Sequence, residues 1–217
     1  MAAQLRRRGY AVNNCAMRGR VSGVLSVLAV AGVSGCTSIS SNYKGAMTVP
    51  SASTIYVCHG FDCTYKTRLD LGASDADRFA SIMAPATTSP AAERAAVSKA
   101  VQYYEERAGQ VIGLRDAPKS HIGQSRERGQ MDCIDESTNT RSLLRYLNER
   151  QLLTHHSVEY NVSRGLFVDG RYPHSTAVLR DKSGKKWAVD SWYEPMGGPP
   201  DIMTLSEWQT RGVMGQR

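Results

Sequence analysis

The sequence GQMDCIDESTNTRSLLRYL, residues 129–147, decides how the rest of the chain is interpreted. It predicts a loop that runs into a helix, because apolar and small residues recur at the i, i+4, i+7 spacing of one helical face. The residues on this predicted face are Cys133, Ser137, Thr140, Leu144 and Leu147.

Three carboxylates stand at the start of the predicted helix, at Asp132, Asp135 and Glu136. Carboxylates there complement the positive end of the helix dipole, so Cys133 is expected in the first helical turn. Unpaired backbone N–H groups in that turn stabilise a thiolate, which is one way to make a nucleophile. A small buried core residue is the alternative that the helix alone leaves open.

Two predicted strands downstream supply partners for such a nucleophile. Residues 172–179 and 186–193 each predict a strand, and the polar, glycine-containing residues 180–185 predict the turn between them. A hairpin of this kind brings Asp190 opposite His174 or within a residue or two of it. Together with Cys133, these residues make a nucleophile, a base and an orienting acid.

The order and spacing of these residues resemble the transglutaminase-like superfamily of the papain-type fold. The most similar members are the bacterial transglutaminase-like cysteine proteinases. The matching motifs are Asp132-Cys133-Ile134-Asp135, then His174 with Ala177-Val178-Leu179 one place out of step, then Val189-Asp190 without an intervening residue. The resemblance covers about residues 129–193.

The resemblance implies an α+β fold of the papain/transglutaminase type, with the nucleophile at the N-terminus of a helix packed on an antiparallel sheet. It implies a protein or peptide substrate, no cofactor, and a triad of Cys133, His174 and Asp190. Calcium-dependent periplasmic members carry an acidic residue just after the cysteine, whereas this chain has Ile134, which argues against calcium binding at Asp132. Papain-like enzymes often use a glutamine side chain to bind the oxyanion.

Gln130 is a candidate for that oxyanion role, three residues before Cys133. Its spacing is not that of the papain-like enzymes, so an ordinary loop residue is the alternative. We predict no metal site among the residues of the chain.

Composition limits the classes of function. A chain of 217 residues with 41% hydrophobic content can bury one core, so we expect one folded domain. Five arginines precede Cys36, which leaves 22 of the 27 Lys and Arg residues against 20 Asp and Glu, a net charge of +2. This balance gives no electrostatic argument for a nucleic-acid partner.

The first 35 residues resemble the signal peptide of a bacterial lipoprotein. Arg18 and Arg20 form a basic region, residues 21–33 are a short apolar run, and Val33-Ser34-Gly35-Cys36 resembles a lipobox. We therefore expect lipid on Cys36, a tether over residues 36–53, and a folded domain over residues 54–217. The expected location is the periplasmic face of the outer membrane; a plain secretory signal or an uncleaved anchor is the alternative.

The remaining cysteines favour a disulfide between Cys58 and Cys63. Residues 54–58 and 63–71 predict two strands around the loop at residues 59–62, so these cysteines face each other in an oxidising compartment. Cys133 is then left unpaired, as a nucleophile must be. A zinc site on Cys58, His59 and Cys63 is the rival interpretation, but no second ligand pair has the usual spacing.

Other segments predict the surrounding framework. Ser74 predicts a helix cap, Ser89-Pro90 predicts the start of a longer helix that ends near Gly109, residues 157–162 predict a strand, and residues 202–208 predict a short closing helix. We expect the chain to be a cysteine peptidase or amidase. The alternatives are a crosslinking transglutaminase, and a binding module of the cell envelope that keeps the fold without catalysis.

Overall fold

The computed structural model describes residues 54–119, 121–165 and 173–211, which all belong to one compact unit that spans Ser38–Arg217. The predicted signal peptide, Cys36 and the tether lie outside the described residues. Within the described part of the chain, no helix is both long enough and apolar enough to cross a membrane.

The fold is α+β. In chain order its elements are β1 (Thr54–His59), β2 (Tyr65–Asp70), α2 (Ala73–Met83), η1 (Ala84–Thr88), α3 (Pro90–Ile112), η2 (Ile122–Gln124), α4 (Cys133–Glu149), β3 (His156–Val158), β4 (Val162–Arg164), β5 (His174–Asp181), β6 (Lys186–Asp190), β7 (Asp201–Thr204) and α5 (Leu205–Thr210).

The strands form two antiparallel sheets. β1 and β2 make a hairpin, and the larger sheet has the order β3-β5-β6-β7, with β4 also paired to β5. The predicted hairpin of β5 and β6 is confirmed, with Ala177 opposite Val189. Continuing this register brings Asp190 level with Thr176, two residues along β5 from His174, within the predicted range.

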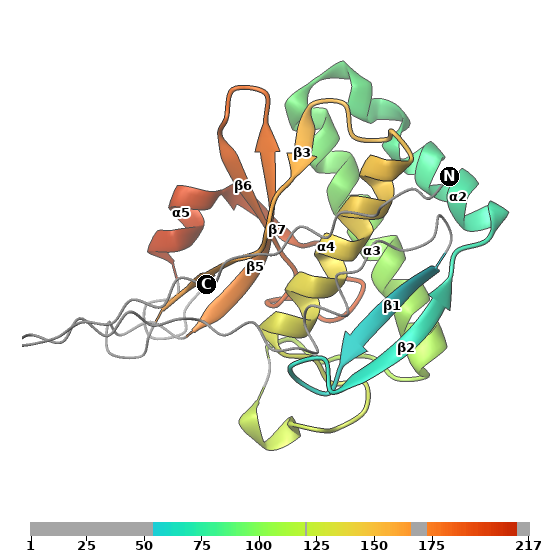
Figure 1. The fold of residues 1–217 in the computed structure, drawn as a ribbon, viewed down its shortest axis with the longest axis vertical. Coiled ribbons are helices and arrows are strands. Elements are labelled where there is room, and N and C mark those ends of the chain that lie inside the picture. Colours follow the sequence, from blue (N-terminus) through green and yellow to red (C-terminus); the bar gives the residue numbers. More distant parts are fainter. Residues whose placement is uncertain (1–53, 120, 166–172, 212–217) are drawn as a thin grey trace, which may run out of the picture. The chain divides into compact units, whose positions relative to one another are not determined.

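Helix α4 is the centre of the fold (Figure 1). It contacts β5, β6 and β3 of the larger sheet, β1 of the hairpin, and α3. Ser137, Thr140, Leu144 and Leu147 of the predicted face are buried, and the other sides of the helix are also buried from Ser137 to Leu144. Its polar side chains bond to its neighbours: Ser137 Oγ donates to Ser175 Oγ at 3.1 Å, and Arg141 Nε donates to the carbonyl of Glu159 at 2.8 Å.

Three predictions that concern the strands are corrected by the structure. The predicted strand at residues 157–162 is two strands, β3 and β4, whose registers against β5 differ by one residue, which is a β-bulge. Ile202 lies in the edge strand β7 and not in the closing helix. Strand β6 ends at Asp190, short of the predicted residue 193, where the Asp190 side chain accepts the N–H of Trp192 at 3.2 Å and turns the chain.

Two helix ends also differ from the predictions. Helix α2 is capped at Gly72 and not at Ser74, because the Asp75 carboxylate accepts the Gly72 N–H at 2.9 Å. Helix α3 begins after Ser89 as predicted but continues past Gly109 to Ile112. It stops there because Gly113 takes the left-handed conformation, with φ 79°, that ends helices.

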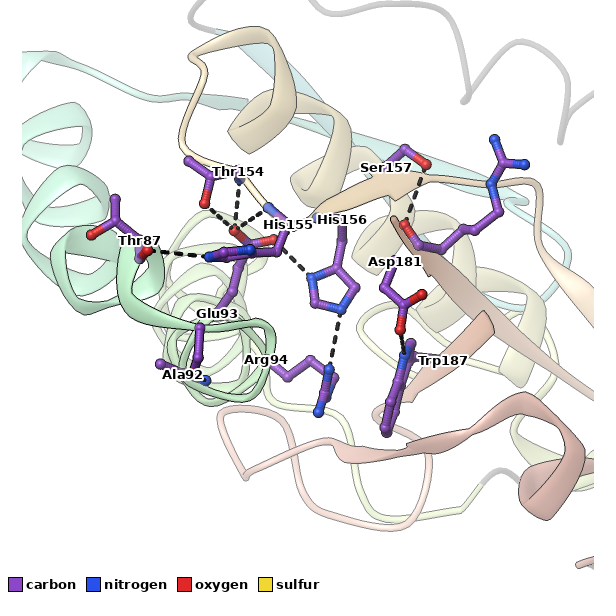
Figure 2. A network of polar contacts seen from close by, with 12 residues as sticks. Thr87, Ala92, Glu93, Arg94, Thr154, His155, His156, Ser157, Asp181 and Trp187 are labelled. Atoms are coloured by element: carbon purple, nitrogen blue, oxygen red, sulfur yellow. Dashed lines mark hydrogen bonds and ion pairs between the residues drawn. The ribbon is translucent and has the colours of Figure 1, made fainter. Parts of the chain in front are cut away.

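A buried carboxylate ties the start of α3 to the larger sheet. Glu93, fully buried, accepts the backbone N–H groups of Thr154, His155 and His156 and the Thr154 hydroxyl at 2.6–2.9 Å, and Nδ1 of His156 lies 2.8 Å from its Oε1. Figure 2 shows this network continuing from Nε2 of His156 to Arg94. Burial alone raises the pKa of Glu93, but the hydrogen bonds from His156, Thr154 and His155 lower it to about 2.

We expect Glu93→Gln to lower the free energy of unfolding by about 3–5 kcal/mol, because a neutral amide of the same size cannot accept all of these donors. Urea denaturation measures this loss. The matched control is Glu106→Gln on the exposed side of the same helix, which should change stability by less than about 0.5 kcal/mol. Equal effects of the two substitutions would contradict this role.

Candidate active site

The start of α4 is fixed by the side chain of Asp132. Its Oδ1 accepts the N–H groups of Ile134 at 3.1 Å and of Asp135 at 2.8 Å. In return, the Asp132 N–H donates to the Asp135 carboxylate at 3.4 Å. This reciprocal capping box fixes the residue at which the helix begins. Cys133 is therefore the first residue of α4, as predicted.

The backbone N–H of Cys133 remains available at the helix end. The Asp132 side chain accepts the N–H groups of Ile134 and Asp135. No acceptor for the Cys133 N–H occurs among the described residues. The Cys133 thiol is partly exposed and not part of a disulfide, and the backbone N–H of Ser175 donates to its sulfur. Because Ser175 follows His174, the first residues of α4 and of β5 meet at this thiol.

His174 is held by Asp190 through one ring nitrogen. Nε2 of His174 lies 2.7 Å from Oδ2 of Asp190, and both side chains are almost fully buried. The other ring nitrogen, Nδ1, is buried and has no hydrogen-bond partner among the described residues. A neutral imidazole that donates from Nε2 to a carboxylate has an acceptor lone pair at Nδ1.

Aromatic rings enclose the pair of His174 and Asp190. The ring centroids of Trp192 and Trp208 lie 4.6 and 5.6 Å from that of His174, and the Tyr193 ring meets His174 edge-on at 5.9 Å. Nε1 of Trp208, in α5, also donates to Asp190 Oδ2 at 2.6 Å. The carboxylate is thus fixed by three donors, counting the Trp192 N–H.

The surroundings of Cys133 favour the neutral thiol. Burial raises the pKa of the thiol, and the negative charges of Asp132, Glu136 and Asp190 raise it further, whereas the Ser175 N–H lowers it. The first helical turn alone would have lowered the pKa. In the resting protein the sulfur therefore carries its proton.

Behind α4 lies a cavity of about 10 Å³, the size of about one water molecule, which is lined by three acids: Glu105, Asp116 and Glu136. The buried hydroxyl of Tyr104 and Oε2 of Glu136 have no partner among the described residues. Burial raises the pKa of Glu105 and of Asp116 to about 7 each, and that of Glu136 well above its usual range.

A proton is shared within this cluster. The carboxyl groups of Asp116 and Glu136 are hydrogen-bonded to each other, which requires that one of them carries a proton. Glu105 accepts the Gly197 N–H at 2.7 Å and a bond from Ser191, the neighbour of Asp190.

Gln130 lies at the predicted position in the loop before Cys133. Its carbonyl accepts the N–H of Gly60 at 2.6 Å, and its Oε1 accepts Nε2 of Gln124 at 3.1 Å. This second bond orients the side-chain amide of Gln130 with its oxygen towards Gln124. The role of Gln130 as an oxyanion donor stays a prediction.

Cys58 and Cys63 form the predicted disulfide. The rival zinc site would need both thiolates, which the disulfide removes. In the described part of the chain, one group of three residues has ligand atoms close enough together for a metal, and it consists of these two cysteines and Asp135. The bonded sulfurs make this group unsuitable for a metal ion.

Sequence reasoning missed three contributors to the site: Trp208, Glu105 and Asp116. Trp208 was assigned to a helix that covers the sheet, yet its indole N–H holds Asp190. Glu105 lies in the middle of α3, and Asp116 lies in the loop that follows this helix. The signal available for Glu105 was its position on the helix beside Tyr104 and Ala108, which line the same cavity.

Comparison with known proteins yields no matching protein family, no matching curated protein and no matching solved structure.

We expect the protein to lose stability as pH rises from about 4 to about 7. The folded pKa of Glu105 is raised from 4.5 to about 7 and that of Asp116 from 3.8 to about 7, so the folded state binds more protons than the unfolded chain in this window. Stability falls with pH wherever the folded state holds the extra protons.

Urea denaturation of the wild type and of Glu105→Gln at about pH 5 and about pH 8 tests this expectation. The wild type should lose on the order of 1–3 kcal/mol more than the variant over this interval, because glutamine does not titrate. Identical pH dependence in the two proteins would contradict the assignment.

We expect Trp208→Phe to lower the free energy of unfolding by about 1–3 kcal/mol, since it removes a donor from buried Asp190 while keeping an aromatic ring. The control is Trp187→Phe, which removes a comparable 3.0 Å bond to Asp181, a partly exposed carboxylate. Denaturation midpoints compare the two variants. A larger loss for Trp187→Phe would show that Asp190 does not depend on Trp208.

Proposed function

We propose that this protein is a cysteine peptidase or amidase that transfers an acyl group to Cys133 and then to water. The observation that carries the proposal is the state of His174. Its Nε2 is engaged by Asp190, while its Nδ1 is buried without a partner among the described residues. The bond from the Ser175 N–H to the Cys133 sulfur brings the thiol to the same end of β5.

The proposed reaction begins at the neutral thiol. The Cys133 sulfur forms a bond to the substrate carbonyl carbon as its proton passes to Nδ1 of His174. Asp190 keeps the Nε2 proton in place and stabilises the imidazolium that forms. Transfer of the proton during the attack fits a thiol whose pKa is raised in the resting protein.

The oxyanion that results needs hydrogen-bond donors. The N–H of Cys133 is one, since the Asp132 cap leaves it unused at the positive end of α4. The side-chain amide of Gln130 is the second candidate, with its oxygen turned to Gln124. Collapse of the intermediate breaks the amide bond, and His174 gives its proton to the leaving amine.

Hydrolysis completes the proposed cycle. His174 accepts a proton from a water molecule that attacks the thioester, and the Cys133 thiol is released with the carboxylic acid. The resemblance of residues 129–193 to the transglutaminase-like cysteine proteinases supports a protein or peptide substrate. No cofactor enters this scheme.

We further propose that the protein acts at the periplasmic face of the outer membrane, anchored by lipid on Cys36. Support comes from the lipobox-like residues 33–36 and from the disulfide, which is common in oxidising compartments.

A binding module without turnover is the second candidate function, and one observation favours it. The raised pKa of the Cys133 thiol is also what an inert, structural cysteine has. A crosslinking transglutaminase would use the same three residues with an amine in place of water. The two enzymes differ in the molecule that accepts the acyl group from Cys133: an amine in a transglutaminase and water in a hydrolase.

We expect Cys133→Ala to abolish labelling by iodoacetamide and any cleavage of peptides by the purified protein. His174→Gln should lower peptide cleavage by about 10²-fold or more, because the general base is lost. Peptide cleavage that survives Cys133→Ala would contradict the proposed mechanism. Release of free acid in water, in the presence of an added amine, distinguishes hydrolysis from crosslinking.

A further inference from the structure

The turn between β1 and β2 has an uncommon backbone conformation. Gly60, Phe61, Asp62 and Cys63 have φ angles of 84°, 68°, 50° and 52°. This left-handed region is unfavourable for residues that carry a Cβ atom. Three such residues in a row persist only if contacts outside the turn stabilise them.

Two acids at the start of α4 provide these contacts. The Phe61 N–H donates to Oδ2 of Asp135 at 2.8 Å and the Cys63 N–H donates to Oδ1 at 2.6 Å. The Asp62 N–H donates to Oδ2 of Asp132 at 3.1 Å. Successive N–H groups that converge in this way form an anion-binding nest. The nest is filled by the two carboxylates on either side of the candidate nucleophile.

Asp132 therefore links the turn to the helix. Its Oδ2 is bound by the turn, and its Oδ1 caps the N–H groups of Ile134 and Asp135. The position of the turn thus sets the position of the cap. Through the cap it sets which N–H group at the helix end stays available, and that group belongs to Cys133.

The disulfide closes the same turn, and both of its ends are bound to α4. The N–H of Cys58 donates to Oδ1 of Asn139 at 2.7 Å, and Nδ2 of Asn139 donates to the Cys58 carbonyl at 2.8 Å. Cys63 is bound through Asp135. Both cysteines are buried, at 0% and 1% exposure. The bridge, the turn and the first two turns of α4 form one connected unit.

We propose that the Cys58–Cys63 disulfide is a positioning element for Cys133. It holds residues 60–63 in the left-handed conformation whose N–H groups orient Asp132 and Asp135. This inference rests on the proposed function, because the position of Cys133 matters for catalysis only if Cys133 is the nucleophile. A bridge across a sequence separation of five removes less chain entropy than one across a long loop. Its main effect is therefore on local geometry.

Two variants that both lack the disulfide test this inference. Cys58→Ala/Cys63→Ala keeps a Cβ at residue 63, where φ is 52°, whereas Cys58→Ala/Cys63→Gly removes the obstacle to that conformation. Amide hydrogen exchange is measured by NMR at Ile134 and Asp135. Amides of Leu143 and Leu144, buried farther along α4, serve as internal reference.

We expect exchange at Ile134 and Asp135 to be about tenfold faster or more in Cys58→Ala/Cys63→Ala, with much less change at the reference amides. Cys58→Ala/Cys63→Gly should recover most of the protection. An equal increase at Leu143 and Leu144 would show global destabilisation alone and overturn the proposal. Failure of the glycine variant to recover protection, or unchanged exchange in the alanine variant, would overturn it as well.

A third variant keeps the test decisive if neither disulfide-free protein folds. Asp135→Asn in the disulfide-bonded protein removes one acceptor oxygen, so exchange at Phe61 and Cys63 should rise about tenfold or more, relative to the reference amides. Unchanged exchange there would overturn the proposal. These exchange rates do not depend on turnover. They therefore test the role of the disulfide separately from the proposed function, which peptide cleavage tests.

Discussion

The carboxylate of Asp132 is the interaction on which the candidate site depends. One oxygen caps the helix and the other receives an N–H from the β1–β2 turn. The cap satisfies the second and third N–H groups of α4, while the first one, at Cys133, has no acceptor in the described part of the chain. A helix that began one residue earlier or later would expose a different N–H and turn the thiol to another direction.

Two groups of acids surround the start of α4. Asp190 accepts hydrogen bonds from His174, Trp192 and Trp208, which fix the orientation of its carboxylate. Glu105, Asp116 and Glu136 line one small cavity, where burial raises the pKa of each carboxyl group. Burial also raises the pKa of the Cys133 thiol, which favours its neutral form.

The local features of the site follow from the sequence, and the contacts that complete it do not. The acids around Cys133 predicted the helix start, and the polar turn at residues 180–185 predicted the register of His174 and Asp190. Periodicity could not show that α4 is buried on nearly every side, because its Ser, Thr, Asn and Arg residues look solvent-facing until their partners are known. Trp208 and Glu105 come from distant segments, so only the tertiary packing brings them to the site.

The most direct test is whether Cys133 forms a thioester. The protein is incubated with p-nitrophenyl acetate, and peptide mass spectrometry locates the acetyl group. Our account predicts acetyl transfer to Cys133 in the wild type and at least about a 10²-fold slower transfer in His174→Gln. No acetyl group on Cys133, or equal rates in the two proteins, would contradict it.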